Sequence, residues 1–336
     1  MNQYLIESNY QLNVSDIMLL SKHFGTELYI ILTDAGKYIV KVMPLFFENV
    51  DNEGYITDFL SSHGLKVAKL LKNKSGYYAT KLSDFQFTIQ EYIMGETLPI
   101  NSAPEWFMEK SAEFLGKTAL YLDGYDSLPL RFGKDFFTVD TVNKKKTQYI
   151  RMLKEATLSG DFDIVPLWET QIHHLDRISN FHIDTDKLTY TGSHGDYHIG
   201  QAIIANNDIA IIDWTSACRL PICLEIITSY VFASPTCING IIDADGLNQY
   251  VRGFSKYFPL TEYDIKAMPY VLYFWHCICN YRPDEYASIP KDYQPIAKLI
   301  NNLLNWLYDH VEELSDALLS KQKATGEDAT PQSKIK

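Results

Sequence analysis

The sequence lacks long hydrophobic runs, and no stretch approaches the roughly 18–20 consecutive apolar residues that a membrane-spanning helix needs. Its first segment, MNQYLIESNYQLNV, has neither a basic region nor an apolar core, so we expect no secretion signal. Cysteine is scarce, with five in 336 residues, and their odd number and irregular spacing do not form a disulfide framework. These absences favour a protein of the reducing cytoplasm without a membrane anchor.

Two of the cysteines, Cys277 and Cys279, form a C-x-C pair beside His276 in LYFWHCICNY. A zinc site would need further ligands at matching spacing, and the sequence offers none. We therefore expect both cysteines to be small apolar core residues of a buried helix.

Positive charge is also in short supply, because 30 Lys and Arg face 42 Asp and Glu, for a net charge of −12. No basic patch stands out, which argues against nucleic acid or an anionic membrane as a partner. The short run NKKKTQ at residues 143–148 is expected to be a solvated helix face, with lysines near a phosphate site as the alternative. The acidic balance weakly favours a cationic small-molecule partner.

Apolar residues, by contrast, make up 46% of the chain, so a large buried core and two lobes are expected. TELYIILTDAGKYIVKVM predicts a β-hairpin with its turn at residues 34–37, followed by a helix that stops at Gly64 and a strand at 87–93. Helical spacing dominates afterwards, in segments near 103–124, 140–158, 163–181, 221–233, 262–281 and 292–320. We expect an N-terminal lobe at 1–94, a helical lobe at 95–320 and a disordered tail at 321–336.

The chemistry concentrates in SHGDYHIGQAIIANNDIAIIDW, where a predicted hairpin would bring Asp196, Gln201 and Asp213 toward one rim. Carboxylate and amide oxygens suit Mg²⁺, whose shell phosphate oxygens can complete. A carboxylate without metal could accept a proton from a hydroxyl, so the set suits phosphoryl transfer. His194 is expected to hold the loop, while His198 either contacts a phosphate or the acceptor or only orders the loop.

This arrangement resembles the H-G-D-x-x-x-x-N … I-D-W segment of the aminoglycoside phosphotransferase and choline kinase family, the small-molecule branch of the protein-kinase-like fold. The resemblance implies an α+β, two-lobed fold with a β-rich N-terminal lobe and a mainly helical C-terminal lobe. It implies that Asp196 is the catalytic base or aligns the acceptor hydroxyl, and that Asp213 holds Mg²⁺. Gln201 departs from the Asn that the family usually has as a second metal ligand, which puts metal affinity in question.

Further motifs occur in the family's order. Lys41 in KYIVKVM resembles the strand lysine that contacts the nucleotide phosphates, although an ordinary edge-strand lysine is the alternative. Glu53, on the following helix, would be its ion-pair partner, with Glu48 as the second choice. Both roles are implied by the resemblance.

IQEYIMGETL is similar to the hinge of these enzymes, which implies that the backbone of Glu91, Tyr92 and Ile93 meets the adenine edge. Gly95 would then let the chain turn into the second lobe. The segment SKHFGTELY offers only Gly25 for a phosphate-covering loop, without a G-x-G-x-x-G pattern.

The segment after Asp213, WTSACRLPICLEIITSY, resembles the family's continuation, with Glu225 expected to brace the catalytic loops. The absence of H-R-D and D-F-G segments, and of an A-P-E segment after Asp213, argues against a protein kinase.

These matches lead to the hypothesis of a kinase that uses ATP or GTP, with Mg²⁺, to phosphorylate a hydroxyl of an antibiotic, amino alcohol or sugar. Acceptor contacts are expected from residues 123–135 and 270–286. The alternative is a kinase-like binding or structural protein with weak or no catalysis, as in relatives of the spore coat, for which Gln201 is the best support.

Overall fold

The computed structural model describes residues 1–23, 25–47, 50–162, 164–279 and 294–326. The chain folds into two compact units. Unit 1 consists of Met1–Leu98 together with Gly200–Ala217, and unit 2 consists of Pro99–Ile199 together with the residues from Cys218 onward. The hairpin at residues 202–211 therefore packs with unit 1, although the predicted ranges put it in the lobe at 95–320.

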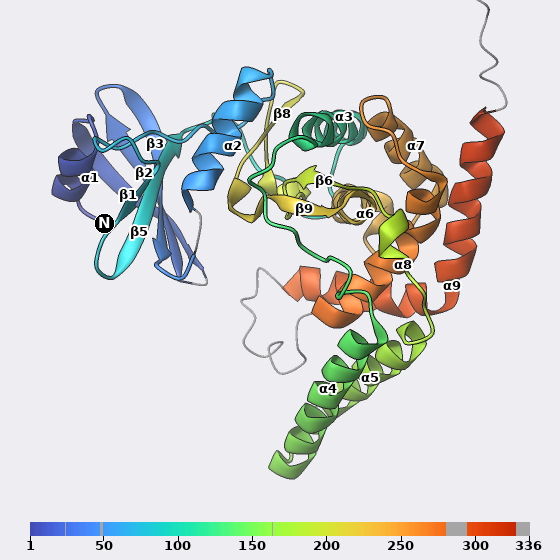
Figure 1. The fold of residues 1–336 in the computed structure, drawn as a ribbon. Coiled ribbons are helices and arrows are strands. Elements are labelled where there is room, and N and C mark those ends of the chain that lie inside the picture. The colour runs from blue at the N-terminus through green and yellow to red at the C-terminus, as the bar shows by residue number, and fades with distance from the viewer. Residues whose placement is uncertain (24, 48–49, 163, 280–293, 327–336) are drawn as a thin grey trace, which may run out of the picture. The chain divides into compact units, whose positions relative to one another are not determined.

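Unit 1 is built on a five-stranded antiparallel sheet with the strand order β1-β2-β3-β5-β4 (Figure 1). Its elements are α1 (Gln3–Asn9), β1 (Val14–His23), β2 (Thr26–Thr33), β3 (Gly36–Pro44), α2 (Val50–Ser62), β4 (Ala79–Lys81) and β5 (Phe85–Glu91). The hairpin β7 (Ala202–Ala205) and β8 (Asp208–Ile211) joins this unit through the bridges Val67↔Ile211 and Glu96↔Ile204.

The side chains of strand β3 point alternately to the two faces of the sheet. Val40 and Val42 pack into a core formed with α1, β1, β2 and β5, while Met43 packs with Val50 of α2 on the opposite face. Because side chains alternate along a strand, Lys41 lies on the same face as Met43, toward α2. The strand thereby brings Lys41 to the helix that carries Glu53.

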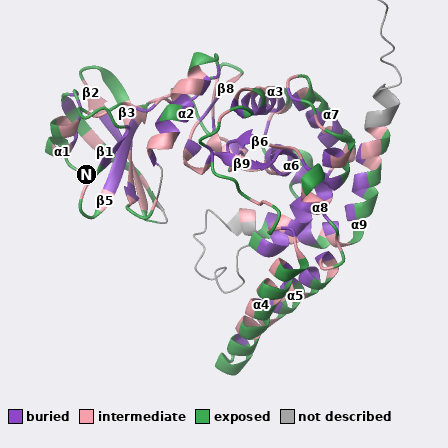
Figure 2. Cartoon of the chain, in the orientation of Figure 1, coloured by how far each residue is buried: buried purple, intermediate pink, exposed green. Residues whose placement is uncertain are grey.

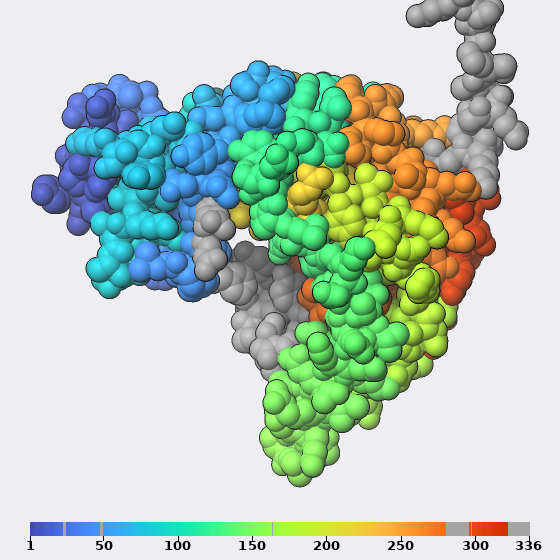
Figure 3. Space-filling model, viewed as in Figure 1, coloured from blue at the N-terminus to red at the C-terminus, as the bar shows by residue number. Residues whose placement is uncertain are grey.

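Unit 2 is mainly helical. Its elements are α3 (Glu105–Leu122), α4 (Val139–Ser159), α5 (Val165–Ile178), α6 (Ile222–Ala233), α7 (Ala244–Ser255), α8 (Glu262–Cys279), α9 (Gln294–Gly326) and the strand pair β6 (Tyr190–Ser193) and β9 (Cys218–Pro221). Helix α6 is buried along almost its whole length and packs against α3, α7 and α8 (Figure 2). Helices α4 and α5 run side by side as an arm that projects from the rest of this unit (Figure 3).

The structure confirms the predicted α+β fold, the 26–43 hairpin and the helices in the predicted segments. It adds elements that were not predicted, notably β1, α7 and the pair β6–β9. Helix α9 continues to Gly326, so residues 321–326 are helical where a tail was expected, and residues 327–336 lie outside the described ranges. Among the described residues, no helix is long and apolar enough to cross a membrane.

The prediction for the C-x-C pair is half right. Cys277 is fully buried on α8, as expected of a core residue. Cys279 is exposed at the last residue of the helix, which is not the buried position expected.

Candidate active site

Lys41 and Asp213 form an ion pair in unit 1, although 172 residues separate them in the sequence. The ammonium of Lys41 lies 2.5 Å from Oδ1 of Asp213, and its side chain is only 12% exposed. Thr215 donates a hydrogen bond to the same oxygen over 2.5 Å. Since an ammonium so far removed from water needs a counter-charge, this pair is worth more than an ordinary surface salt bridge.

Asp213 has an unusual backbone conformation. It follows β8 and precedes a short 3-10 turn at Trp214–Ser216, and its φ of +61° lies in the left-handed region. Non-glycine residues rarely adopt this conformation, and such strained positions concentrate at functional sites. The tight turn directs a partly exposed carboxylate toward Lys41.

Glu53 of α2 is buried, and its Oε1 accepts a hydrogen bond from the backbone N–H of Trp214 at 2.9 Å. Burial raises the pKa of Glu53 to about 7, while the nearby charge of Lys41 acts in the opposite direction. The carboxylate therefore lies close to Lys41 and holds the residue next to Asp213. Glu48, the second choice for this role, lies outside the described residues.

Gln201 lies beside Asp213 at the open end of the β7–β8 hairpin. Ala202 pairs with Ile211 in the hairpin register, and Ile212 donates its backbone N–H to the carbonyl oxygen of Gln201 at 3.0 Å. The two predicted metal ligands are thus adjacent in space.

One carboxylate and one amide form a small donor set. Within the described ranges, no group of three or more His, Cys, Asp or Glu side chains is arranged to hold a metal. Mg²⁺ commonly takes only one or two carboxylates from the protein and completes its shell with water and substrate phosphates. The oxygen donors of Asp213 and Gln201 therefore fit Mg²⁺ accompanied by phosphate.

Asp196 belongs to the loop that follows β6 in unit 2. Its side chain is 57% exposed, whereas its neighbours His194 and Tyr197 are buried. The Nε2 atom of His198 lies 4.0 Å from Oδ2 of Asp196. The loop thus presents one carboxylate to solvent from an otherwise buried backbone. The predicted convergence of Asp196 with Asp213 joins the two units and stays a prediction.

Glu225, in the first turn of α6, holds the backbone of this loop. It is 4% exposed, and its two carboxylate oxygens accept the backbone N–H groups of His194 at 3.1 Å and of Tyr197 at 3.2 Å. Burial raises the pKa of Glu225 to about 8, although the N–H donors act in the opposite direction. These bonds fix the backbone on both sides of Asp196, which agrees with the predicted bracing role.

The raised pKa of Glu225 predicts a pH-dependent stability. In the unfolded chain the carboxyl loses its proton near pH 4.5, and in the folded chain near pH 8. Because the folded state alone keeps this proton between these values, the contribution is complete below pH 4.5 and is lost as the pH rises to about 8. We expect Glu225→Gln, which cannot ionise, to remove this decline, which is at most about 1.4 kcal/mol per pH unit.

Urea unfolding at pH 5, 6, 7 and 8 measures this slope. Glu53 contributes to the wild-type slope up to about pH 7, so the difference between wild type and variant isolates Glu225. Glu109→Gln, on the exposed side of α3, is the matched control and should keep the wild-type slope. Parallel profiles for Glu225→Gln and wild type would show that Glu225 does not titrate as described.

A buried chain of hydroxyl groups also holds the catalytic loop, and sequence reasoning missed it. Tyr197 donates its hydroxyl to the backbone oxygen of Ser111 on α3, and the Ser111 side chain lies 2.8 Å from the hydroxyl of Tyr250 on α7. Tyr250 in turn lies 3.0 Å from the hydroxyl of Ser229 on α6. Three helices thereby anchor the residue that follows Asp196.

The predicted hinge, Glu91, Tyr92 and Ile93, begins at the last residue of β5 in unit 1. Glu91 donates its N–H to the carbonyl of Lys69 at 2.9 Å, so a base contact would fall to the other backbone groups of these residues. Gly95 has a φ of +154°, and a Cβ added there would lie 2.5 Å from the carbonyl oxygen of Ile204. In this structure the glycine therefore permits the close approach of strand β7.

Gly25 lies in the tight turn between β1 and β2, with a φ of +79°. A Cβ added there would lie 3.2 Å from Cγ of Pro44, at the end of β3. The neighbouring Phe24 lies outside the described residues. A role of this turn in covering phosphates stays a prediction.

A separate hollow of about 510 Å³ lies between α5 and α9 in unit 2. Its lining includes Glu169, His173, Tyr308 and Asp309, and none of the predicted site residues. His173 and Tyr308 stack with their ring centroids 4.6 Å apart, which fills part of this helix crossing. The predicted chemistry therefore lies elsewhere.

Comparison with known proteins identifies the family. The sequence matches the model of the phosphotransferase enzyme family over residues 16–257, which is more than two thirds of the chain. The chain belongs to this family. Every predicted site residue, from Gly25 to Asp213, lies inside the matched range, and membership supports phosphotransferase activity on a small molecule. No curated protein matches the sequence significantly.

Solved structures share the fold at low sequence identity. An aminoglycoside phosphotransferase from Alicyclobacillus acidocaldarius is 14% identical with a TM-score of 0.62, covering 98% of this chain and 97% of that one. Amicoumacin kinase, in complex with AMP-PNP, Ca²⁺ and Ami, is 12% identical with a TM-score of 0.59 and 88% coverage of both chains. A microcompartment-associated aminopropanol kinase is 12% identical with a TM-score of 0.58, covering 94% of this chain and 97% of that one. These similarities establish the protein-kinase-like fold.

Proposed function

We propose that this protein is an ATP- or GTP-dependent phosphotransferase that transfers the γ-phosphoryl group to a hydroxyl of a small molecule. The observation that carries the proposal is the cluster of Lys41, Asp213 and Glu53 in unit 1, with Gln201 beside it. A cation held by a carboxylate next to further oxygen donors is the arrangement that a phosphate chain with its metal requires.

Each residue of the proposed site has its own role in the phosphoryl transfer. The oxygen of the acceptor hydroxyl bonds to the γ-phosphorus as the bond from that phosphorus to the β,γ-bridging oxygen breaks, and the nucleoside diphosphate leaves. Asp196 accepts the hydroxyl proton, because its exposed carboxylate can reach a bound acceptor while Glu225 keeps the loop backbone fixed. Lys41 steadies the phosphates, and Asp213 and Gln201 would hold Mg²⁺.

Mg²⁺, when bound, neutralises the negative charge of the phosphates. Asp213 serves both Lys41 and the metal, so the two cations would share one carboxylate. Glu53 keeps that carboxylate in place through the N–H of Trp214. Catalysis then depends on positioning and charge neutralisation.

Gln201 allows a direct test of the second metal position. We expect Gln201→Asn to keep or improve the affinity for the Mg²⁺–nucleotide complex, because Asn retains the amide oxygen on a shorter side chain. Gln201→Ala should weaken it about tenfold, since Mg²⁺ tolerates the loss of a ligand poorly. Isothermal titration with Mg²⁺ and a non-hydrolysable ATP analogue measures both, and equal affinities for Asn, Ala and wild type would exclude Gln201 from the metal shell.

A second candidate function is a kinase-like binding protein with weak or no turnover. Gln201 supports it, because the longer side chain shifts the ligand oxygen from the position that the family usually uses. The presence of Lys41, Asp196 and Asp213 favours the active enzyme over this alternative.

Two measurements test the proposal. Mg²⁺ with ATP or GTP should raise the Tm, and a screen of hydroxylated antibiotics, amino alcohols and sugars with the stabilising nucleotide should find an acceptor that is phosphorylated. A nucleotide that stabilises the protein without any transfer would favour the binding protein. The absence of stabilisation by either nucleotide would overturn the phosphotransferase and favour a structural protein with the same fold.

A further inference from the structure

An unbroken row of aromatic rings in unit 2 begins next to Asp196. The ring of His198 lies 6.2 Å from that of Phe232, at the end of α6, and Phe232 lies 6.5 Å from His276 on α8. The row continues from His276 to Trp275 at 4.5 Å, from Trp275 to Phe132 at 6.3 Å and from Phe132 to Phe136 at 4.7 Å. We call these six residues the aromatic wall.

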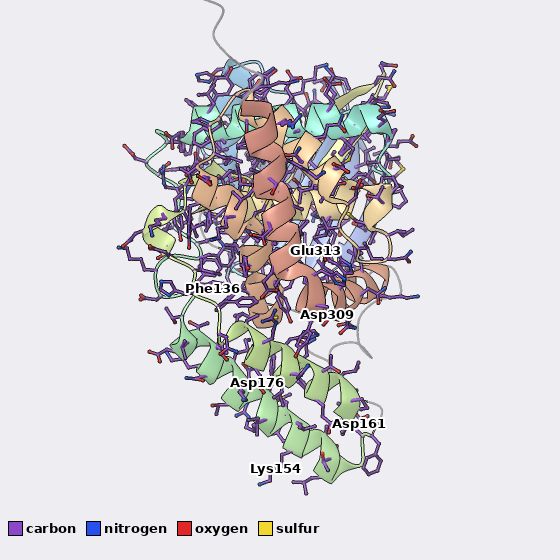
Figure 4. All side chains as sticks on the ribbon, turned by 90° about the vertical axis from the view of Figure 1, so that its right-hand side faces the viewer. Phe136, Lys154, Asp161, Asp176, Asp309 and Glu313 are labelled. Carbon is purple, nitrogen blue, oxygen red and sulfur yellow. The ribbon has the colours of Figure 1, made fainter. Side chains whose placement is uncertain are left out.

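The wall is only partly buried. His198, Phe132, Phe136, Phe232 and Trp275 are all intermediate in exposure, and His276 is buried behind them. Phe136 lies where the arm of α4 and α5 begins (Figure 4). Rings in the interior of a core have no exposed surface. The exposed parts of these rings can therefore contact a ligand.

Hydrogen bonds to the backbone fix the end of the aromatic wall that lies near the loop of Asp196. Asn101, with a left-handed φ of 55°, donates its backbone N–H to the carbonyl of Phe232 at 2.8 Å. Its side-chain amide donates to the carbonyls of Val231 and Ser234 at 2.7 and 2.8 Å. Three hydrogen bonds from one buried residue therefore hold Phe232 in position.

Hydrogen bonds to the backbone also fix the other end of the aromatic wall, at Phe132. Phe132 has a φ of +56°, a costly conformation for an aromatic residue, and the hydroxyl of Tyr190 donates to its carbonyl at 2.7 Å. The preceding Arg131 is tied by its backbone N–H to the carbonyl of Arg219 on β9. Strain that the surroundings maintain in this way is typical of ligand-binding positions.

Charged groups lie near both ends of the wall. Asp196, through His198, lies at one end, and the guanidinium of Arg131 lies 5.5 Å from the ring of Phe132 at the other.

We propose that the aromatic wall binds an acceptor with a planar aromatic body, whose hydroxyl then reaches Asp196. This inference rests on the proposed function, because it assigns the substrate class of the same site. The exposed ring surface would hold the planar body.

Three probes separate the possible classes: 2-naphthalenemethanol as a planar aryl alcohol, kanamycin as a polycationic aminosugar and choline as a small organic cation. Ligand-observed NMR measures their binding to the full chain without nucleotide, and a transfer assay with Mg²⁺ and ATP or GTP measures turnover. We expect the aryl alcohol to bind most tightly, and Phe232→Ala to weaken this binding about tenfold.

Three variants control the experiment. Phe232→Leu keeps most of the volume and should restore part of the binding, which separates a lost ring from a damaged fold. Trp275→Phe keeps one aromatic ring at this position but loses part of the indole surface, so it should weaken the binding of the aryl alcohol less than Phe232→Ala does. Phe162→Ala removes an aromatic side chain that is 69% exposed near the end of α4, and it should change nothing.

The outcomes separate this inference from the proposed function. Binding of the aryl alcohol that depends on Phe232 supports the wall, even if no probe is phosphorylated and the proposed function fails. Phosphorylation of kanamycin or choline that is unaffected by Phe232→Ala overturns the wall while the proposed function stands. Equal binding of all three probes by wild type and Phe232→Ala also overturns the wall.

Discussion

Asp196→Asn is expected to lower kcat by about 10²–10⁴-fold while it leaves the Kd of the nucleotide within about twofold of wild type. The exposed carboxylate is the only group changed, and an amide cannot take the proton of the acceptor hydroxyl. The loop should keep its shape, because its contacts with Glu225 are made by the backbone of His194 and Tyr197. Steady-state kinetics with an identified acceptor and isothermal titration with the nucleotide measure the two quantities.

The control for this variant is Asp161→Asn. Asp161 is exposed at the far end of the α4–α5 arm, where the same chemical change should leave kcat unaltered (Figure 4). If Asp196→Asn turns over at the wild-type rate, the assignment of the base is wrong. If it instead loses nucleotide affinity, Asp196 acts on the phosphates and not on the acceptor.

The part of the site that follows from local pattern was predictable. The alternation of β3 places Lys41 on one face, and the turn between two apolar runs sets the register of β7 and β8, with Gln201 and Asp213 adjacent at its open end. In both places the pattern lies within about twenty residues, so the side-chain period decides the geometry.

The other contacts of the site join segments that are far apart in the sequence, so no local sequence pattern indicates them. Trp214 meets Glu53 through its backbone N–H, a group that every non-proline residue carries, so no sequence letter marks it. The hydroxyls of Ser111 and Tyr250 meet only because α3, α6 and α7 pack together. Strands β6 and β9 are four residues each, too short for their alternation to stand out. The same holds for the aromatic wall, whose rings come from four segments of the chain.

Glu53 and Glu225 have the same structural role, each within its own unit. Each is a buried carboxylate that accepts backbone N–H groups close to a predicted site aspartate: Trp214, next to Asp213, and His194 and Tyr197, on either side of Asp196. Burial raises the pKa of both, to about 7 and about 8. These bonds position both aspartates through the backbone and do not use the aspartate carboxylates.

Asp213→Asn is expected to have the second large effect, on both catalysis and stability. It removes the charge that would hold Mg²⁺, so kcat should fall by at least about 10²–10³-fold, the cost of losing one electrostatic contact in a transition state. It also leaves the ammonium of Lys41, 12% exposed, beside a neutral amide. Because the carboxylate of Glu53 stays close to Lys41, losing this one counter-charge should lower the free energy of unfolding by at most about 3 kcal/mol. Kinetics and urea unfolding measure the two effects.

The same hairpin provides the matched control. Asp208 on β8 pairs with Lys66 over 2.5 Å, the same distance as in the Lys41–Asp213 pair, but the Lys66 side chain is 64% exposed. Asp208→Asn should therefore cost less than about 1 kcal/mol and leave kcat unchanged. A double variant, Lys41→Met with Asp213→Asn, should be more stable than Asp213→Asn alone, because it also removes the ammonium that has lost one counter-charge. If the double variant is less stable by the sum of both single effects, the two side chains do not act as a pair.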